Sequence, residues 1–166
     1  MLKKCRPEDM ILFDLDYGEL LRPPFEILRD RGWGQCTNAS GEPLIVYGPK
    51  HERDRSIFDT SPYALNPGCV TPDGWDCDGF FVPSDREVYR WSRIRRGPLV
   101  IKYWNYRRFA VRSISSDRYA CTWSNGVFQP SQINWAIPNL SHEDIRRRLG
   151  LPAEADSESG RPFRVK

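Results

Sequence analysis

The segment PLVIKYWNYRRFAVRSISSDRYACTW, residues 98–123, carries a clear β-strand pattern. Residues 98–106 form a β-rich apolar run, whereas in 108–114 and 119–123 successive side chains alternate between two faces. Period-two alternation of this kind is typical of a strand with one buried face. The segment therefore predicts three consecutive strands.

Turn signals separate these strands. The polar SSDR, residues 115–118, can turn the second strand into the third. Asn125-Gly126 tolerates the positive φ values of a type I′ turn, so we expect it to join the third strand to a fourth at 127–129. A further hairpin is expected around the polar turn at 38–41. These segments predict an antiparallel β-meander sheet of four to six strands.

Short helices are expected near the N-terminus. Pro7 is followed by two acidic residues, as at a helix start, and the apolar run after it could be a short helix or a strand. A second short helix is predicted over Phe25–Arg31, because Gly32 can take the positive φ of a helix cap.

The clearest helix signal lies in NLSHEDIRRRLGLP, residues 139–152. Ser141 is a good N-cap, and Asp144 stands where a capping-box acid is expected. Gly150 ends the helix. We expect His142 to be a surface residue of its first turn.

These elements predict an α+β fold, in which an antiparallel meander sheet packs with short N-terminal helices and one capped C-terminal helix. The chain has 166 residues, of which 39% are hydrophobic, enough for one core. We expect residues 1–152 to form a single globular domain and 153–166 to form a polar C-terminal tail.

Charge is distributed unevenly along the chain. Residues 1–85 contain 9 basic and 15 acidic residues, whereas 86–166 contain 16 basic and 7 acidic residues. The asymmetry predicts either an anionic partner for the second half or electrostatic pairing between the halves. The sequence leaves both alternatives open.

A basic aromatic region, residues 86–112, is the strongest functional signal. It contains nine basic residues against one acid, Glu87, with six interleaved aromatic rings. Arg, Tyr and Trp are enriched in protein interfaces, and the same residue types bind phosphates and stacked bases. The candidate partner-binding residues are Arg90, Trp91, Arg93, Arg95, Arg96, Lys102, Trp104, Arg107 and Arg108.

Three functions remain open at this stage. The first is a non-catalytic binding protein (an adaptor, an inhibitor or an assembly subunit) with a protein partner or a second copy of itself. The second is a nucleic-acid-binding module. The third is a small enzyme whose active site gathers dispersed residues such as His51, Asp76 and Arg108. We favour the first function, and no catalytic residue can be assigned from spacing.

The stretch PDGWDCDGFF, residues 72–81, has the composition of a metal loop. In a calcium loop the first ligand position would fall on Gly74, which has no side-chain oxygen. We expect an aromatic-anchored turn instead, with no bound metal and no cofactor. A zinc set is chemically sufficient, although its spacing is not specific. That set is Cys36, His51, Cys69 and Cys77.

The segment ILFDLDYGELL, residues 11–21, resembles the first motif of the haloacid dehalogenase phosphatases. That resemblance implies Asp14 as nucleophile and Asp16 as acid/base. Tyr17 and Glu19 depart from the motif, and the chain lacks the alternating strands and helices of a parallel sheet. We expect these carboxylates to face solvent.

The five cysteines are odd in number and scattered, which predicts free, partly buried thiols. No window reaches the roughly 18 apolar residues of a membrane helix, and the start lacks the apolar run of a signal peptide. We therefore expect a cytoplasmic protein with no membrane partner.

Overall fold

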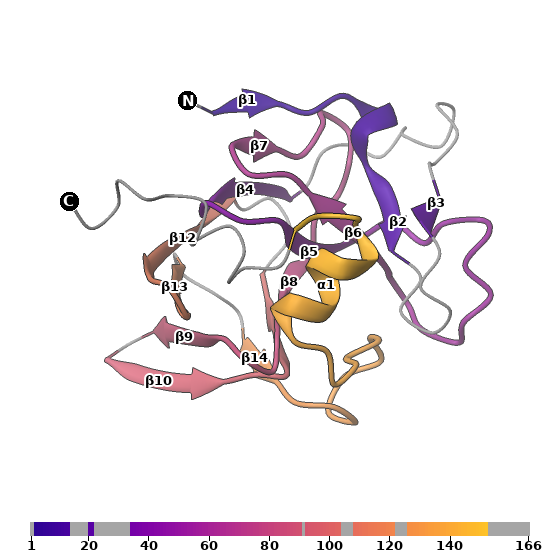
Figure 1. Cartoon of the computed structure of the whole chain (residues 1–166). Coiled ribbons are helices and arrows are strands. Elements are labelled where there is room, and N and C mark those ends of the chain that lie inside the picture. The colour runs from indigo at the N-terminus through magenta and orange to yellow at the C-terminus, as the bar shows by residue number, and fades with distance from the viewer. Residues whose placement is uncertain are drawn as a thin grey trace.

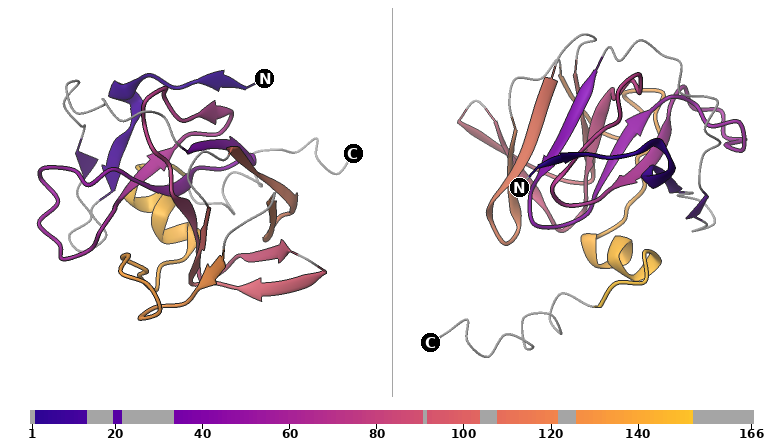
Figure 2. Two further views of the ribbon diagram at one scale, coloured as in Figure 1. Left: turned by 180° about the vertical axis from the view of Figure 1, so that it is seen from behind. Right: turned by 90° about the horizontal axis from the view of Figure 1, so that it is seen from above.

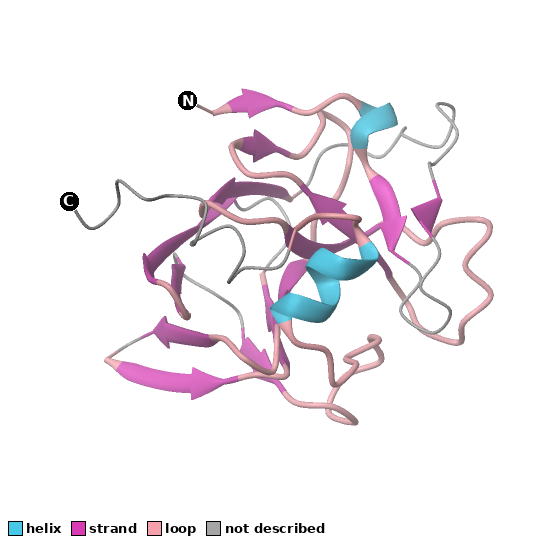
Figure 3. Ribbon diagram, viewed as in Figure 1, coloured by secondary structure: helices cyan, strands magenta, loops and turns pink. Residues whose placement is uncertain are grey.

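The computed structural model describes residues 2–13, 20–21, 34–90, 92–103, 108–121 and 126–152. Within these residues, fourteen strands form two seven-stranded sheets (Figure 1). The described helices are a 3₁₀ turn, η1 (Pro7–Asp9), and one short α-helix, α1 (His142–Arg148). The predicted α+β class is therefore wrong, because the fold is mainly β (Figure 3).

Sheet A is mixed, with the strand order β1-β7-β4-β12-β13-β9-β10. Its strands are β1 (Lys3–Lys4), β7 (Cys69–Val70), β4 (Gln35–Ala39), β12 (Arg108–Ser115), β13 (Arg118–Cys121), β9 (Glu87–Arg90) and β10 (Arg93–Arg96). Three neighbouring pairs are parallel, namely β1 with β7, β4 with β12 and β13 with β9. Parallel neighbours need long connections, so this sheet is not a meander.

Sheet B is antiparallel, with the strand order β14-β11-β8-β5-β6-β2-β3. Its strands are β14 (Gly126–Phe128), β11 (Leu99–Lys102), β8 (Gly79–Val82), β5 (Leu44–Gly48), β6 (Ser61–Leu65), β2 (Ile11–Phe13) and β3 (Leu20–Leu21). Most of its members come from separate parts of the chain, so sequence order does not reveal their pairing.

The main core lies between the two sheets. Phe109 and Val111 of β12 point into it, and Phe80 and Ile101 meet them from sheet B. The rings of Phe80 and Phe109 stack with their centroids 6.0 Å apart. The predicted alternation in β12 is confirmed over 108–112, where Arg108 and Arg112 are exposed, but not beyond, because Ser113 and Ile114 are both exposed.

The second face of sheet B is covered by the C-terminal segment and α1. Tyr47 of β5 stacks on Trp135 at a centroid distance of 4.8 Å, and Phe81 of β8 packs in the same cluster with Ile145 of α1. Seen from above, α1 lies to one side of the two sheets (Figure 2). Burial on both faces explains why β5 and β8 are apolar throughout rather than alternating.

Two predicted hairpins are wrong because the chain crosses between the sheets at those points. β4 pairs with β12 and β7 in sheet A, whereas β5 pairs with β6 and β8 in sheet B. The strand that follows Asn125 pairs with β11 and not with β13. The SSDR turn is confirmed, because β12 and β13 are antiparallel neighbours.

The helix predictions have mixed outcomes. The Pro7 signal produces only a 3₁₀ turn, and the apolar run after it is strand β2. Phe25–Arg31 lies outside the described residues, as do 153–166. The α1 helix is confirmed, with a capping box between Ser141 and Asp144. His142, predicted at the surface, is completely buried. No helix among the described residues has the length and apolar character to cross a membrane.

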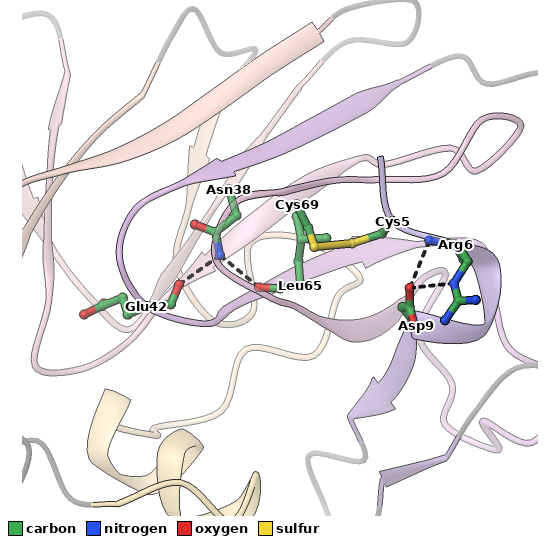
Figure 4. Close-up of a disulfide and its surroundings, with 7 residues drawn as sticks. All are labelled: Cys5, Arg6, Asp9, Asn38, Glu42, Leu65 and Cys69. Carbon is green, nitrogen blue, oxygen red and sulfur yellow. Dashed lines mark hydrogen bonds and ion pairs between the residues drawn. A yellow bond between two sulfur atoms is a disulfide. The ribbon is translucent and has the colours of Figure 1, made fainter. Parts of the chain in front are cut away.

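Two disulfides join segments that are distant in sequence. Cys5 bonds to Cys69 across 64 positions, with Cα atoms 5.5 Å apart (Figure 4), and Cys36 bonds to Cys77 across 41 positions, with Cα atoms 5.9 Å apart. Near the first bridge, the side-chain amide of Asn38 donates to the Glu42 and Leu65 carbonyls at 2.8 and 2.9 Å.

The prediction of free thiols is therefore wrong for four cysteines, and only Cys121 is a free thiol. The zinc set is wrong as well, because Cys36 and Cys69 are each bonded to another cysteine and a disulfide sulfur is not the thiolate that zinc requires. The expected turn is present at 72–75, whereas residues 79–81 of the same stretch belong to β8; Trp75, Phe80 and Phe81 are all buried.

Candidate partner-binding face

The structure places part of the predicted binding set on sheet A but on its two faces, because Arg90, Arg93 and Arg95 share the face of buried Val88 whereas Arg96 lies on the other face. Arg90 lies on β9, and its neighbour β10 carries Arg93, Arg95 and Arg96. Arg108 begins β12 of the same sheet, two strands away from β9, whereas Lys102 ends β11 in sheet B. The remaining predicted residues, Trp91, Trp104 and Arg107, lie outside the described residues.

Strand alternation turns one face of sheet A to solvent. Phe109 and Val111 fill the core, so Arg108 and Arg112 on the same strand point away from it. On β9, Val88 is buried and the next residue is exposed for the same reason. We call the resulting surface the basic face of sheet A. It consists of Tyr89, Ile94, Arg96, Arg108, Arg112 and Arg118.

A row of aligned residues crosses the basic face. Arg112 of β12 faces Ala120 of β13, which faces Tyr89 of β9, which faces Ile94 of β10. Tyr89 is 41% exposed and Ile94 46% exposed. An aromatic ring and an aliphatic side chain therefore lie next to each other in solvent, with a small residue between them and the arginine.

The next row is charged. Arg118 of β13, Glu87 of β9 and Arg96 of β10 face one another in register. One Glu87 oxygen lies 2.9 Å from Arg118 Nη2, and the other lies 3.6 Å from Arg96 Nη1. One carboxylate serves two guanidinium groups, so the row keeps a positive excess.

Some other arginines of this sheet have no carboxylate partner among the described residues. In the part of the chain that the structure describes, no carboxylate forms an ion pair with Arg93, Arg108 or Arg112. Of the two open alternatives for the charge asymmetry, pairing between the halves is thus incomplete on this sheet.

Pairing between the halves does occur inside the molecule, at Arg86. Its Nε and Nη2 atoms donate to the two carboxylate oxygens of Glu42 at 3.0 and 3.1 Å. The Tyr119 hydroxyl donates to the same carboxylate. Burial, followed by the negative charge of Glu42, raises the pKa of Tyr119, so the phenol stays protonated as a donor. The side chains of Arg86 and Glu42 are only 4% and 14% exposed.

His142 completes this buried cluster. Arg86 Nη2 lies 3.1 Å from His142 Nδ1, and because a guanidinium can only donate, Nδ1 must be the acceptor. The ring proton of a neutral imidazole is then on Nε2, which lies 3.5 Å from a Glu42 oxygen. The backbone N–H of His142 donates to Asp85 at 2.6 Å.

The cluster joins the corner between β4 and β5, the start of β9, strand β13 and the first residue of α1. Since its charged groups are almost fully buried, we interpret it as a structural clamp rather than a substrate site. Sequence reasoning missed it, because the hydrogen-bonded partners Arg86–Glu42, Arg86–His142 and Tyr119–Glu42 lie 44 to 77 positions apart and share no motif.

A serine, a histidine and an aspartate also meet beside β6, which bears on the enzyme alternative. Ser61 Oγ donates to Asp54 at 2.5 Å and accepts from the His51 backbone N–H at 2.9 Å. His51 Nδ1 accepts from the Arg53 backbone N–H at 3.0 Å. In a hydrolytic triad the serine hydroxyl donates to the imidazole, whereas here it donates to the Asp54 carboxylate. We therefore interpret these hydrogen bonds as holding the loop before β6 in place and not as a catalytic triad.

The charge state of Asp54 fits that structural role. Partial burial acts to raise the pKa of Asp54, but hydrogen bonds from Ser61 and Ser56 and the charge of Lys50 outweigh it and lower the pKa overall. Two of the dispersed residues named for a possible active site also differ in exposure, since Arg108 is exposed on β12 whereas His51 is buried. Among the described residues, no three His, Cys, Asp or Glu side chains form a group that could hold a metal ion.

Comparison with protein-family models, with curated proteins and with solved structures finds no match to this chain.

Proposed function

We propose that this chain is a non-catalytic binding protein that holds a protein partner on the basic face of sheet A. The observation that carries the proposal is the row in which Tyr89 and Ile94 lie exposed side by side, in line with Arg112. Tyrosine and arginine are the residue types that most often dominate protein interfaces, where an apolar centre is surrounded by polar groups.

The position of the row supports the same function. Its residues come from four adjacent strands, which span about 14 Å at the usual strand spacing. The inner side of this sheet is packed against the main core, so the exposed side chains are held on a rigid support. A preordered surface loses little conformational entropy on binding.

We further propose that the protein works in an oxidising environment. Two disulfides support this environment and weigh against the expected cytoplasmic one, since disulfides persist in secreted and extracellular proteins and are rare in the cytosol. The partner is then a protein of that same environment.

Nucleic acid remains the second candidate, favoured by the exposed arginines that form no ion pair within the described residues, Arg108 and Arg112. Single-strand binding also needs stacking platforms. Tyr89 is the exposed aromatic ring that the described part of this face offers, which is less than such a surface usually presents. We therefore rank a protein partner first.

Photo-cross-linking tests the proposal. A photoreactive phenylalanine analogue replaces Tyr89 and, in a control, replaces the exposed Asn66 in the turn between β6 and β7. In the extracellular fluid of the producing organism, we expect a defined protein to cross-link from position 89 and not from position 66.

The charge variants Arg112→Glu and Arg53→Glu complete this test, since both carry the same charge change and only Arg112 belongs to the basic face. Arg112→Glu should abolish the cross-link, and Arg53→Glu should leave it unchanged. Equal yields from positions 89 and 66 would refute the proposal. Binding of a labelled single-stranded oligonucleotide that depends on Arg112 would instead establish the nucleic-acid alternative.

A further inference from the structure

Strand β10 forms one edge of sheet A. It is the last strand of that sheet within the described residues and pairs on one side with β9, at the rim of the molecule (Figure 1). A strand in this position presents backbone N–H and C=O groups that can bind a further strand.

The hydrogen-bond register shows which residues face the edge. Gly97 N–H donates to the Arg86 carbonyl at 3.0 Å, which extends the β9 and β10 register by one pair. Hydrogen-bonded and non-hydrogen-bonded pairs alternate in an antiparallel ladder. The backbone N–H and C=O groups of Arg95 and Arg93 are therefore also directed toward β9. The backbone groups of Ile94 and Arg96 therefore point away from β9, toward the sheet edge.

The positive charge of β10 determines which kind of strand can pair with its free edge. Three of its four residues are arginines, and within the described residues Arg93 and Arg95 form no ion pair. A second copy of β10 in the same place would bring arginines opposite arginines, which is destabilising. An acidic strand would bring carboxylates opposite them instead.

We propose that β10 docks an extended, acidic segment of the protein partner, which adds to sheet A as a further antiparallel strand. This inference rests on the proposed function and specifies how the partner is held. The segment forms its backbone bonds with Ile94 and Arg96. Its side chains opposite Arg93 and Arg95 occupy non-hydrogen-bonded pairs, where cross-strand side chains lie closest, so those positions are acidic.

The side chain opposite Ile94 lies on the basic face, next to the exposed side chain of Ile94, so an uncharged residue fits there. The recognised pattern therefore alternates acidic and uncharged residues. The peptide EVETEVE presents this pattern and is the probe for the test, with KVKTKVK as the charge-inverted control.

Backbone N-methylation separates strand addition from simple charge attraction. Methylating the amides of the valines and the threonine removes the donors that face β10, and we expect affinity measured by fluorescence anisotropy to fall about tenfold or more. Methylating the glutamate amides, which face solvent in this register, should leave the affinity unchanged. The reverse pattern would support edge docking by a parallel strand, and equal effects of the two methylation patterns would overturn the proposal.

A charge swap on the protein tests the specificity. The double variant Arg93→Glu and Arg95→Glu should lose EVETEVE and gain KVKTKVK, with an unchanged melting temperature as the check on folding. Because both substitutions lie at exposed or half-exposed positions, the fold should tolerate them. A variant that still prefers EVETEVE would overturn the proposal.

Failure of this inference is distinguishable from failure of the proposed function. If EVETEVE does not bind while cross-linking from position 89 still depends on Arg112, the partner uses the face but not the edge, and this inference alone is wrong. If both readouts fail, the proposed function is wrong as well.

Discussion

At the residue scale, Glu42 is the centre of the buried clamp. Its carboxylate accepts two hydrogen bonds from Arg86 and one from Tyr119, and it lies near His142 Nε2. A buried ion pair adds little net stability compared with apolar side chains, but removing one member leaves a buried charge uncompensated. The clamp should therefore respond strongly to a change that removes charge and keeps size.

We predict that Glu42→Gln lowers the free energy of unfolding by about 3 kcal/mol, because the buried guanidinium of Arg86 then loses the carboxylate charge that pairs with it at 3.0 Å. Urea denaturation at neutral pH measures the change. The exposed Glu52→Gln is the matched control and should shift the free energy by less than about 0.5 kcal/mol. Equal effects of the two substitutions would show that the clamp does not stabilise the fold.

Individual positions differ in how far sequence determines them. The inward Phe109 and the outward Arg112 were predictable, because strand alternation is a local property. Arg86 resembles the other arginines of the basic region in sequence, yet it is buried. The capping pattern predicted the backbone at His142 correctly, but the burial of its side chain depends on Arg86, 56 positions away.

At the element scale, some strands were recognisable but most of their partners were not. The alternating pattern signalled β12 and β13, whereas residues 79–81 of β8 lie in a stretch that was expected to be a turn. Pairing was wrong wherever the chain changes sheet, as between β4 and β5. Turn chemistry describes the bend and not which sheet the next strand joins, so the meander was the wrong extrapolation.

The cap of α1 yields a pH-dependent prediction. The Ser141 backbone N–H lowers the pKa of Asp144 below its ordinary value of 3.8, and the charge of Arg147 lowers it further. The folded state therefore prefers the ionised carboxylate. Its contribution to stability is fully present above the unfolded-state pKa and is lost as the pH falls through the folded-state pKa.

We predict that Asp144→Asn lowers the free energy of unfolding at pH 7 and that the difference from the parent protein shrinks as the pH is lowered below about 4. Urea titrations across this range measure the difference. Ser141→Ala should cost about 1 kcal/mol by removing the other half of the capping box. If the Asp144→Asn difference were the same at pH 3 and pH 7, the carboxylate would not be stabilising the cap through its charge.

At the scale of the whole molecule, contacts between residues that are distant in sequence determine features that sequence patterns do not reveal. The acidic first half contributes Glu42 to the buried clamp, whereas Arg108 and Arg112 on sheet A remain exposed. Cysteine count alone favoured free thiols, because disulfide partners are identified by proximity in the fold. The basic region is visible in the sequence, but only the topology separates its exposed arginines from Arg86 in the interior.

The disulfides provide the last prediction. We expect one cysteine, Cys121, to react with iodoacetamide in the denatured, unreduced protein, and all five to react after reduction. In the native protein Cys121 should react slowly, because burial raises the pKa of its thiol. Mass spectrometry counts the added groups.

Reduction should also destabilise the fold. The chain-entropy model assigns about 4 kcal/mol to each bridge, because each closes a long loop, and such a loss is a large part of the stability of a typical domain. Cys121→Ser, which removes no bridge, is the matched control and should leave the effect of reduction unchanged. Five reactive thiols before reduction would show that neither bridge forms, and they would also remove the argument for an oxidising environment.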